Sequence, residues 1–450
     1  MKYIPSLDKN FQPMVVVLDE FNERVLKEEH KVLKIYLERT NGYNYIYEMN
    51  IFANGHEEEN YSVVERVVKS LLWMVGGFRI AINGDLDIYA RLAKDYCIGG
   101  TRGFDVEFMS KIYEHPFEVD YLDVLPELKS ENKEFVNSLK GCRIGFDAGG
   151  SDRKVSAVVD GKVLYSEETV WFPKLNTDPQ YHYDGILDSM KKAASYMPRV
   201  DAIGVSSAGV YVDNKIMAAS LFVKVNEEDF NKHVKNMYID VAKEFGDVPL
   251  VVANDGDVTA LAGALELHDG EILGIAMGTS EAAGYVDKNQ SLLGWLNELA
   301  FASTDFNKNS LVDEWSGDYG CGCKYFSQDA VIKLAGYGGL DIPSEYSLAE
   351  KLKYVQKLNE EGNEIANQIF ENIGIYLGYT IAYYAKFYKI KHVLLLGRVV
   401  SGKGGNTILD VASKVLADEY PQLNISLSMP DESNRRVGQS IAAAMMPTIE

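Results

Sequence analysis

The sequence predicts an α/β protein with two domains and an additional amino-terminal module. Short runs of Val, Ile, Leu and Ala lead into glycine-containing turns at three places, and this pattern is typical of strands whose ends face a ligand. The runs lie at 142–148, 250–253 and 391–396. Helical segments alternate with these strands, as in α/β folds. A chain of 450 residues is long enough for two or three domains, each with its own core.

Residues 1–139 are expected to form a separate α+β module. The predicted strands lie at 14–18, 32–37, 45–52 and 78–82, and the predicted helices at 62–75 and 86–96. Gly76 and Gly77 would end the first helix. The polar stretch 127–137 is the expected link to the rest of the chain. The module contains no phosphate loop, metal-ligand spacing or basic recognition helix, so we expect a role in interaction or oligomerisation.

A predicted hairpin follows Cys142, and its turn contains two glycines. Gly149 and Gly150 would let the backbone approach a phosphate closely. Asp147, at the end of the first strand, is a candidate ligand for Mg²⁺, directly or through water. Ser151 belongs to the same turn, and Lys154 could reach a transferred phosphoryl group as a point charge. An ordinary hairpin with a glycine turn explains this segment equally well when it is taken alone.

The stretch from 250 to 284 carries the central candidate residues. A strand at 250–253 leads into a helix through Asn254 and Asp255, and a second strand at 272–276 ends at a Gly-Thr-Ser loop. A carboxylate at a helix start can be held over a substrate, so we predict that Asp255 faces an acceptor hydroxyl. Its position at the helix start predicts a low pKa, which would make it a weak base.

The loop after that second strand is a candidate phosphate site. Gly278, Thr279 and Ser280 would leave backbone N–H groups free for phosphate oxygens. Both Asn-Asp-Gly and Gly-Thr-Ser are also ordinary turn sequences. The functional interpretation therefore depends on matching parts elsewhere in the chain.

Further candidate ligand residues lie on either side of this stretch. The predicted strand 202–206 ends in a turn of small residues that includes Ser207 and Gly209, which leaves room for a ligand. Glu298 could accept hydrogen bonds from a polyhydroxylated substrate, although a solvated surface glutamate is the ordinary alternative.

The third junction follows a long helix predicted over 363–388. A buried strand at 391–396 is followed by a glycine turn and then by a helix at 407–420. Junctions of this kind bind nucleotides at the carboxyl edge of a sheet. The candidate nucleotide-binding residues of this turn are Gly397, Arg398, Gly402, Gly404 and Gly405. Arg398 and Lys403 would supply the local positive charge that the acidic overall balance lacks.

The four cysteines, Cys97, Cys142, Cys321 and Cys323, are too few for a disulfide framework. A Cys-x-Cys pair needs two further zinc ligands, and neither histidine nor another cysteine lies nearby in the sequence. We therefore expect no structural zinc and two buried thiols at 321 and 323.

The net charge of −21 and the isoelectric point near 4.9 exclude whole classes of partner. Such a surface repels nucleic-acid backbones and anionic membranes. The first residues have no apolar signal-peptide core, and no apolar run is long enough to span a bilayer. We expect a cytoplasmic protein.

Four elements, taken together, resemble the superfamily of actin-like ATPases (ribonuclease H-like domains) and sugar kinases. Within it, the chain looks most like the ROK family of repressors and sugar kinases. The resemblance covers residues from about 140 to 450. It rests on the ordered set Asp147-x-Gly149-Gly150-Ser151-x-x-Lys154, Asn254-Asp255, Gly278-Thr279-Ser280 and Gly397–Gly405.

The resemblance implies two actin-like ATPase domains around a cleft, at 140–250 and 251–435, with the terminal helix 436–450 packing back on the first. It also implies ATP and Mg²⁺ as cofactors, a sugar or sugar derivative as substrate, and a homodimer. Asp255 would be the catalytic base, and Asn254 and Glu298 would contact the sugar. Asp147 would organise Mg²⁺, residues 149–154 and 278–280 would hold the phosphates, and 397–405 would line the adenosine pocket.

Three departures from the family pattern affect the sugar side and the zinc site. Ser220 replaces a sugar-binding Asn, Phe301 replaces a His, and the zinc cluster is reduced to Cys321 and Cys323, with Gln328 at an expected cysteine position. A kinase with an altered substrate is the leading hypothesis. The alternatives are a sugar-sensing regulator or scaffold without turnover, and an ATPase or phosphohydrolase of the same superfamily.

Overall fold

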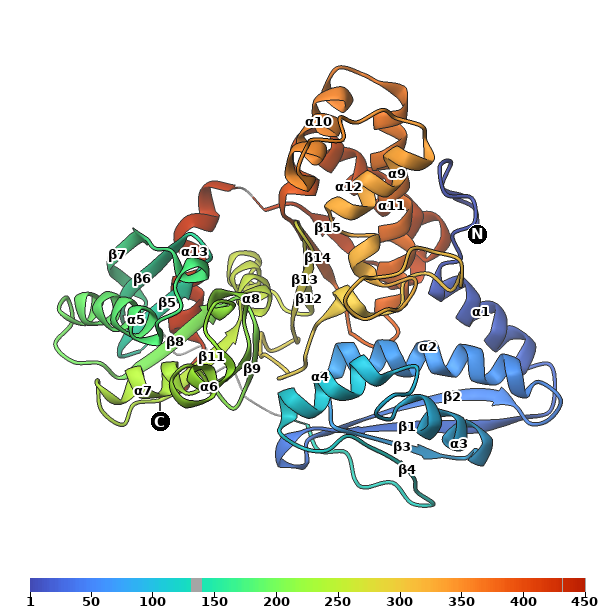
Figure 1. Ribbon diagram of the computed structural model, residues 1–450, viewed down its shortest axis with the longest axis horizontal. Helices are drawn as coiled ribbons and strands as arrows, with labels where there is room; N and C mark the ends of the chain where they lie inside the picture. Colours follow the sequence, from blue (N-terminus) through green and yellow to red (C-terminus); the bar gives the residue numbers. More distant parts are fainter. Residues whose placement is uncertain (131–139, 431, 450) are drawn as a thin grey trace. The chain divides into compact units, whose positions relative to one another are not determined.

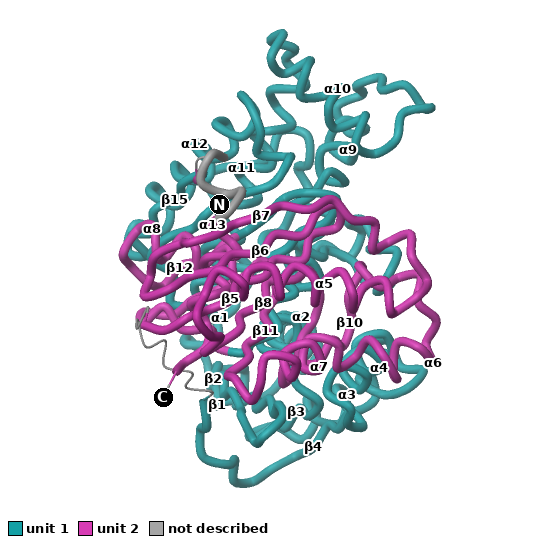
Figure 2. Tube along the Cα trace, turned by 90° about the vertical axis from the view of Figure 1, so that its left-hand side faces the viewer, with its two compact units in different colours: residues 1–131, 275–283, 294–429 teal, residues 132–274, 284–293, 430–450 magenta. Residues whose placement is uncertain are grey.

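The computed structural model describes residues 1–130, 140–430 and 432–449, with the side chains of 432–437 excepted. The chain forms two compact units, each made of several segments (Figure 2). Unit 1 contains residues 1–131, 275–283 and 294–429, and unit 2 contains 132–274, 284–293 and 430–450. The candidate site residues are therefore divided between two bodies, which are described separately below.

Unit 2 is built on a five-stranded mixed sheet with the order β11-β8-β5-β6-β7 (Figure 1). β5 pairs in parallel with β8 and antiparallel with β6, so the predicted hairpin after Cys142 is confirmed. The strands are β5 (Cys142–Ala148), β6 (Asp152–Val159), β7 (Lys162–Val170), β8 (Ala202–Ser207) and β11 (Leu250–Asn254). Smaller elements are β9 (Val210–Val212), β10 (Lys215–Ala218) and α6 (Glu227–Asp229).

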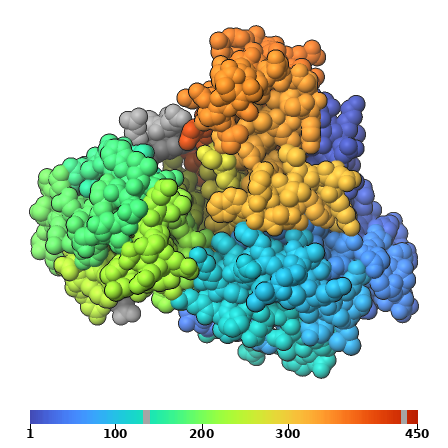
Figure 3. Space-filling model, viewed as in Figure 1, coloured from blue at the N-terminus to red at the C-terminus, as the bar shows by residue number. Residues whose placement is uncertain are grey.

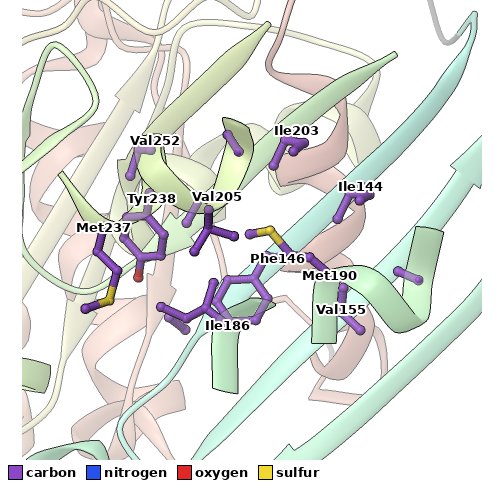
Figure 4. Close-up of a cluster of buried hydrophobic side chains, with 14 of the residues drawn as sticks. Ile144, Phe146, Val155, Ile186, Met190, Ile203, Val205, Met237, Tyr238 and Val252 are labelled. Atoms are coloured by element: carbon purple, nitrogen blue, oxygen red, sulfur yellow. The ribbon is translucent and has the colours of Figure 1, made fainter. Parts of the chain in front are cut away.

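The core of unit 2 lies between this sheet and the helices α5 (Pro179–Ala194) and α7 (Met237–Lys243). Phe146 of β5, Ile186 of α5 and Tyr238 of α7 point into it (Figure 4). These apolar side chains hold in place the strand ends that carry the candidate residues.

The terminal helix α13 (Glu432–Met445) packs against β5 and β8 at very short range. A Cβ atom at Gly145 would lie 1.7 Å from the carbonyl oxygen of Ser440, and one at Gly204 would lie 1.7 Å from that of Ala443. Glycine is therefore required at both strand positions for the helix to approach the sheet.

The first part of unit 1 is a four-stranded sheet with the order β2-β1-β3-β4, along which the long helix α2 runs (Figure 1). The strands are β1 (His30–Glu38), β2 (Asn44–Phe52), β3 (Arg79–Asn83) and β4 (Glu118–Tyr121). The helices are α1 (Met14–Val25), α2 (Glu57–Val75), α3 (Leu86–Asp95) and α4 (Gly103–Tyr113).

The strand predicted at 14–18 is wrong, because these residues begin helix α1. The apolar positions continue beyond the short run that suggested a strand. Met14, Leu18, Phe21 and Val25 recur at helical spacing and are all buried, so a helix buries one continuous apolar face.

The second part of unit 1 carries a sheet with the order β13-β12-β14-β15. Its strands are β12 (Ile272–Met277), β13 (Glu281–Val286), β14 (His392–Leu396) and β15 (Ser426–Ser428), and the division between the units falls within β12 and β13. The helices are α9 (Gln328–Tyr337), α10 (Leu348–Glu360), α11 (Glu364–Tyr384) and α12 (Gly402–Glu419).

The glycine turn predicted after β14 is shorter than expected, because residues 402–406 belong to α12. The glycines of this first helical turn allow close packing. A Cβ atom at Gly404 would lie 2.6 Å from the ring of Phe370 on α11, and one at Gly405 would lie 1.8 Å from the carbonyl oxygen of Val400. Tertiary packing here outweighs the low helix propensity of glycine.

Residues 1–131 and 294–429 belong to the same compact unit, and Figure 3 shows the blue amino-terminal surface in contact with the orange part of the chain. Buried ion pairs connect these two segments. Asp318 accepts from Arg66 at 2.8 Å and lies 2.9 Å from both Lys69 and Arg102. That residues 1–139 form a domain of their own remains a prediction.

No helix among the described residues combines the length and the apolar character that crossing a membrane requires.

Candidate functional site

Asp147 and Lys154 lie opposite each other on β5 and β6 of unit 2. Asp147 is buried, and its Oδ1 accepts a hydrogen bond of 2.8 Å from the Ser206 hydroxyl. The Lys154 Nζ lies 3.8 Å from Asp147 Oδ2 and donates a 2.7 Å hydrogen bond to Asp152. Lysine is therefore held between two carboxylates at the end of the hairpin.

Burial raises the pKa of Asp147 to about 6, and the Ser206 hydrogen bond and the Lys154 charge offset this only in part. The charge of Asp255 raises the pKa of Asp147 further. The charge of one predicted aspartate therefore raises the pKa of another that lies far from it in the sequence, within the same unit. A buried carboxylate at a strand end, with a lysine beside it, fits the donor set expected for Mg²⁺ next to a phosphate.

The glycine turn between β5 and β6 is closed by its own backbone. The Gly149 N–H donates to the Asp152 carbonyl at 3.0 Å, and the Trp171 indole donates to the Gly149 carbonyl at 2.8 Å. A Cβ atom at Gly149 would lie 2.7 Å from the Asp152 carbonyl oxygen, so the tight turn requires glycine. Among the described residues, the N–H groups of Gly150 and Ser151 make no backbone hydrogen bond outside the strands, which leaves them as the candidate phosphate donors of this turn.

Asn254 and Asp255 stand where β11 ends and α8 (Asp255–Leu267) begins. Asn254 caps the helix by accepting from the Gly256 N–H at 2.7 Å, and its amide donates to the Gly209 carbonyl at 2.6 Å. Gly209 has a φ of +145°, and a Cβ atom there would lie 2.4 Å from the Ala218 carbonyl oxygen. The Asn254 side chain thus fixes the small-residue turn beside Asp255.

The low pKa predicted for Asp255 is wrong. Burial raises its pKa, and the backbone N–H groups of the helix start offset that effect only in part. The side chain remains partly exposed. Among the described residues, no cation lies within ion-pair distance of it. Asp255 is consequently a stronger base than its helix position alone indicated.

Ser207 ends β8 in the interior of unit 2. Its hydroxyl accepts a hydrogen bond of 3.1 Å from Tyr238, and the residue is fully buried. The structure gives this candidate substrate residue a packing role, and contact with a substrate stays a prediction.

The Gly278 loop lies in unit 1 and is only partly open to a ligand. The Gly278 N–H donates to the Ser280 carbonyl at 3.0 Å, and the Gly278 carbonyl accepts from Gln328 at 2.9 Å. The prediction of free N–H groups therefore fails for Gly278. In the described part of the chain, the N–H groups of Thr279 and Ser280 have no hydrogen-bond partner.

Glu281, which follows this loop, was not singled out from the sequence. It is 4% exposed, and neither carboxylate oxygen has a hydrogen-bond partner among the described residues. Burial, with a further contribution from Glu298, raises its pKa to about 8. A Cβ atom at Gly322 would lie 2.3 Å from Glu281 Oε2. The sequence feature that could have identified Glu281 is a glutamate in an otherwise apolar strand, Glu-Ala-Ala-Gly-Tyr-Val.

Gly397 brings β14 close to β12 in unit 1. Its φ is +95°, and a Cβ atom would lie 2.3 Å from the Met277 carbonyl oxygen. Arg398 is exposed, and its carbonyl accepts from Gln356 at 2.7 Å. Close packing explains the glycines at 397, 404 and 405, so their contact with a nucleotide stays a prediction.

Cys321 and Cys323 are both buried, as expected. Burial raises the pKa of the Cys321 thiol to about 11. No group of three or more His, Cys, Asp or Glu side chains suited to a metal ion occurs in the described ranges.

Solved structures resemble this chain, although no family model matches it and no curated protein matches its sequence. The ROK hexokinase from Thermus thermophilus aligns with a TM-score of 0.54 at 16% identity, over 68% of this chain and 98% of that one. A ROK family transcriptional regulator, a homologue of the E. coli MLC protein, aligns with a TM-score of 0.53 at 16% identity, over 68% of this chain and 77% of that one.

The chain has the ROK fold. The α/β class and the resemblance inferred from the sequence are confirmed at this level. At such low identity the likeness shows the fold alone, and the ROK fold carries both an enzyme and a regulator in these two structures.

The predicted site residues fall into two sets, one in each compact unit. Unit 2 holds Asp147, Gly149, Gly150, Ser151, Lys154, Ser207, Gly209, Asn254 and Asp255. Unit 1 holds Gly278, Thr279, Ser280, Glu298, Gly397, Arg398, Gly402, Gly404 and Gly405. Their roles in binding and catalysis stay predictions.

Proposed function

We propose that this protein is an ATP-dependent kinase that phosphorylates a hydroxyl of a sugar or sugar derivative, with Asp255 as the general base. The observation that carries the proposal is the arrangement in unit 2. Asp255, a partly exposed carboxylate with no cationic partner among the described residues, begins a helix, and its charge raises the pKa of Asp147, which in turn lies 3.8 Å from Lys154.

The residues of the chain would divide the work as follows. Asp147 would hold Mg²⁺, directly or through water, and Lys154 would stabilise negative charge on the phosphoryl oxygens. Asp255 would orient the acceptor hydroxyl and take its proton. Bound Mg²⁺-ATP supplies an electrophilic phosphoryl group whose charge is partly neutralised. Since this transfer has a loose transition state, positioning contributes much of the rate.

The remaining candidates complete the proposal. The N–H groups of Gly150, Ser151, Thr279 and Ser280 would hold phosphate oxygens, and the segment 397–405 would line the adenosine site. Asn254 and Glu298 would contact the sugar, beside the turn at 207–209. The homodimer and a cytoplasmic location belong to the same proposal.

The test is ADP release from Mg²⁺-ATP in the presence of hexoses, N-acetylated amino sugars and polyols. Release that a sugar stimulates in the wild type, and that Asp255→Asn abolishes, supports the kinase. Asp247→Asn serves as the matched control, because Asp247 is an exposed aspartate of the same unit. Sugar-independent release would instead indicate an ATPase.

A sugar-sensing regulator or scaffold is the second candidate. The likeness in fold to a transcriptional regulator favours it, together with Ser220 and Phe301 at positions where the ROK resemblance implies sugar-side polar residues. Saturable sugar binding without ADP release, in both the wild type and Asp255→Asn, would support this candidate over the kinase.

A further inference from the structure

A polar pocket of about 650 Å³ lies on unit 1, outside every candidate residue named above. Its walls come from the amino-terminal segment 7–12 and from the loop 307–310, with Tyr337 at the end of α9. The volume falls within the range of roughly 300–1,000 Å³ that is usual for small-molecule sites.

Hydrogen bonds hold both walls in place. The Leu7 N–H donates to Asn372 Oδ1 at 2.9 Å, and the Gln12 N–H donates to Asp305 Oδ1 at 2.9 Å. Asn307 bridges the two walls by donating to the Asn10 carbonyl at 3.2 Å. A ligand would therefore meet a preformed pocket and would not have to order the two segments.

Lys333, a buried cation beside the pocket, is paired with Asp8, one of the residues that line the pocket. Lys333 Nζ lies 3.7 Å from Asp8 and 3.7 Å from the ring centroid of Tyr325. Burial lowers the pKa of Lys333 to about 8, and the Asp8 charge opposes this. Asp8 also accepts a 2.6 Å hydrogen bond from Tyr376. The Asp8 carboxylate therefore already interacts with two residues of the protein, Lys333 and Tyr376.

The lining as a whole is close to neutral, which is unusual for a chain with a net charge of −21. Its charged side chains, Asp8 and Lys9, have opposite signs. Most of the remaining lining consists of amides, including the exposed side chains of Asn10, Gln12 and Asn309. An amide both donates and accepts hydrogen bonds, as a hydroxyl does, so this lining suits a ligand rich in hydroxyl groups.

We propose that this pocket binds a neutral, hydroxyl-rich ligand, of the size of a short oligosaccharide, at a site separate from the residues proposed for catalysis. A strongly anionic ligand would find only one lysine in the lining, within an acidic surface. A strongly cationic one would compete with Lys333 for Asp8. The pocket is larger than one sugar ring requires, which favours two or more linked rings.

The test is isothermal titration calorimetry of the full chain with maltose, sucrose, cellobiose and lactose, and with glucose 6-phosphate as the anionic comparison. The double variant Gln12→Ala/Asn309→Ala removes two exposed amides. The hydrogen bonds that Gln12 and Asn309 make within the described chain use their backbone N–H and carbonyl groups, so the fold should persist. Gln422→Ala is the control, because Gln422 is an exposed glutamine of the same unit.

We expect saturable binding of at least one disaccharide in the wild type, in Gln422→Ala and in Asp255→Asn, and affinity at least tenfold weaker in the double variant. Absence of saturable binding for all four disaccharides overturns the proposal, and so does equal affinity in the double variant. Loss of binding in Asp255→Asn also overturns it, because the disaccharide would then occupy the proposed catalytic site. None of these outcomes requires that the chain be a kinase.

Discussion

Asp255 is the residue on which the proposed reaction depends most directly. Because a general base contributes roughly 10² to 10⁴ to a rate, Asp255→Asn should lower kcat by that factor. Asn254, which caps the helix, is unchanged in this variant, so the fold should persist. Steady-state kinetics and circular dichroism on the variant and on Asp247→Asn check this. An Asp255→Asn variant with wild-type kcat would refute the assignment.

Glu281 should make the stability of the protein depend on pH. Its folded-state pKa of about 8 lies above its ordinary value of 4.5. Between these values the unfolded chain ionises Glu281 while the folded chain keeps the proton. The contribution of Glu281 to the free energy of unfolding is therefore fully present below about pH 4.5. It decreases by about 1.4 kcal/mol per pH unit as the pH rises toward 8.

The measurement is urea unfolding of the wild type and Glu281→Gln from pH 5 to 8. Glutamine cannot ionise, so the variant should gain stability relative to the wild type as pH rises. Because both proteins share every other titrating group, the difference between them isolates Glu281. A difference that stays constant over this range would contradict the prediction.

Individual site residues could be predicted from the sequence when their chemistry is local. Asp147 and Lys154 lie on neighbouring strands of one hairpin, and the spacing of seven residues places them opposite each other. The pKa of Asp255 could not be predicted, because it depends on burial by residues distant in sequence. Glu281 was missed for the same reason.

At the scale of elements, the contact between α11 and α12 depends on glycine. A Cβ atom at Gly378 would lie 2.6 Å from the Val415 side chain, whereas one at Gly336, on α9, meets no atom within 4 Å. Gly378→Ala should therefore destabilise the protein by about 1–3 kcal/mol through overpacking. Gly336→Ala should stabilise it by roughly 0.5–1 kcal/mol, because alanine favours a helix.

Thermal and urea unfolding of the two variants tests this prediction, because the changes in unfolding free energy should have opposite signs. Both changes add the same methyl group to a helical glycine, so helix propensity alone would stabilise both. If Gly378→Ala proved as stable as Gly336→Ala, the close contact between α11 and α12 would be wrong.

The elements could be predicted where apolar periodicity was long or turn chemistry was strong. The strand predicted at 250–253 corresponds to β11 (Leu250–Asn254), and the helix predicted at 363–388 corresponds to α11 (Glu364–Tyr384), for this reason. The segment at 14–18 was mispredicted because five residues do not distinguish a strand from one side of a helix. The predicted start of α12 is too late in the sequence. Its glycines, considered only by their local sequence, indicate a turn, whereas in the folded chain they allow the helix to pack closely.

At the scale of the whole molecule, one buried carboxylate connects the amino-terminal segment to the rest of unit 1. Burial alone would raise the pKa of Asp318, but Arg66, Lys69 and Arg102 lower it below its usual range. Removing one partner of a buried ion pair typically costs roughly 3–5 kcal/mol. Asp318→Asn should therefore lower the unfolding free energy by about that amount.

Urea unfolding of Asp318→Asn tests this prediction, and the exposed Asp341→Asn of the same unit is the control. Since Asp318 joins residues 66–102 to the later segment, fluorescence and circular dichroism should report a shared loss of stability. A loss confined to one probe would indicate that residues 1–131 unfold independently.

The network around Asp318 also bears on the order in which the protein can mature during synthesis. Arg66, Lys69 and Arg102 leave the ribosome about 215 to 250 residues before Asp318 does. At roughly 5–20 residues per second, the nascent amino-terminal segment remains without this counter-ion for about 11 to 50 seconds. The amino-terminal segment is translated first, but it can complete its ion pairs with Asp318 only after the later segment has left the ribosome.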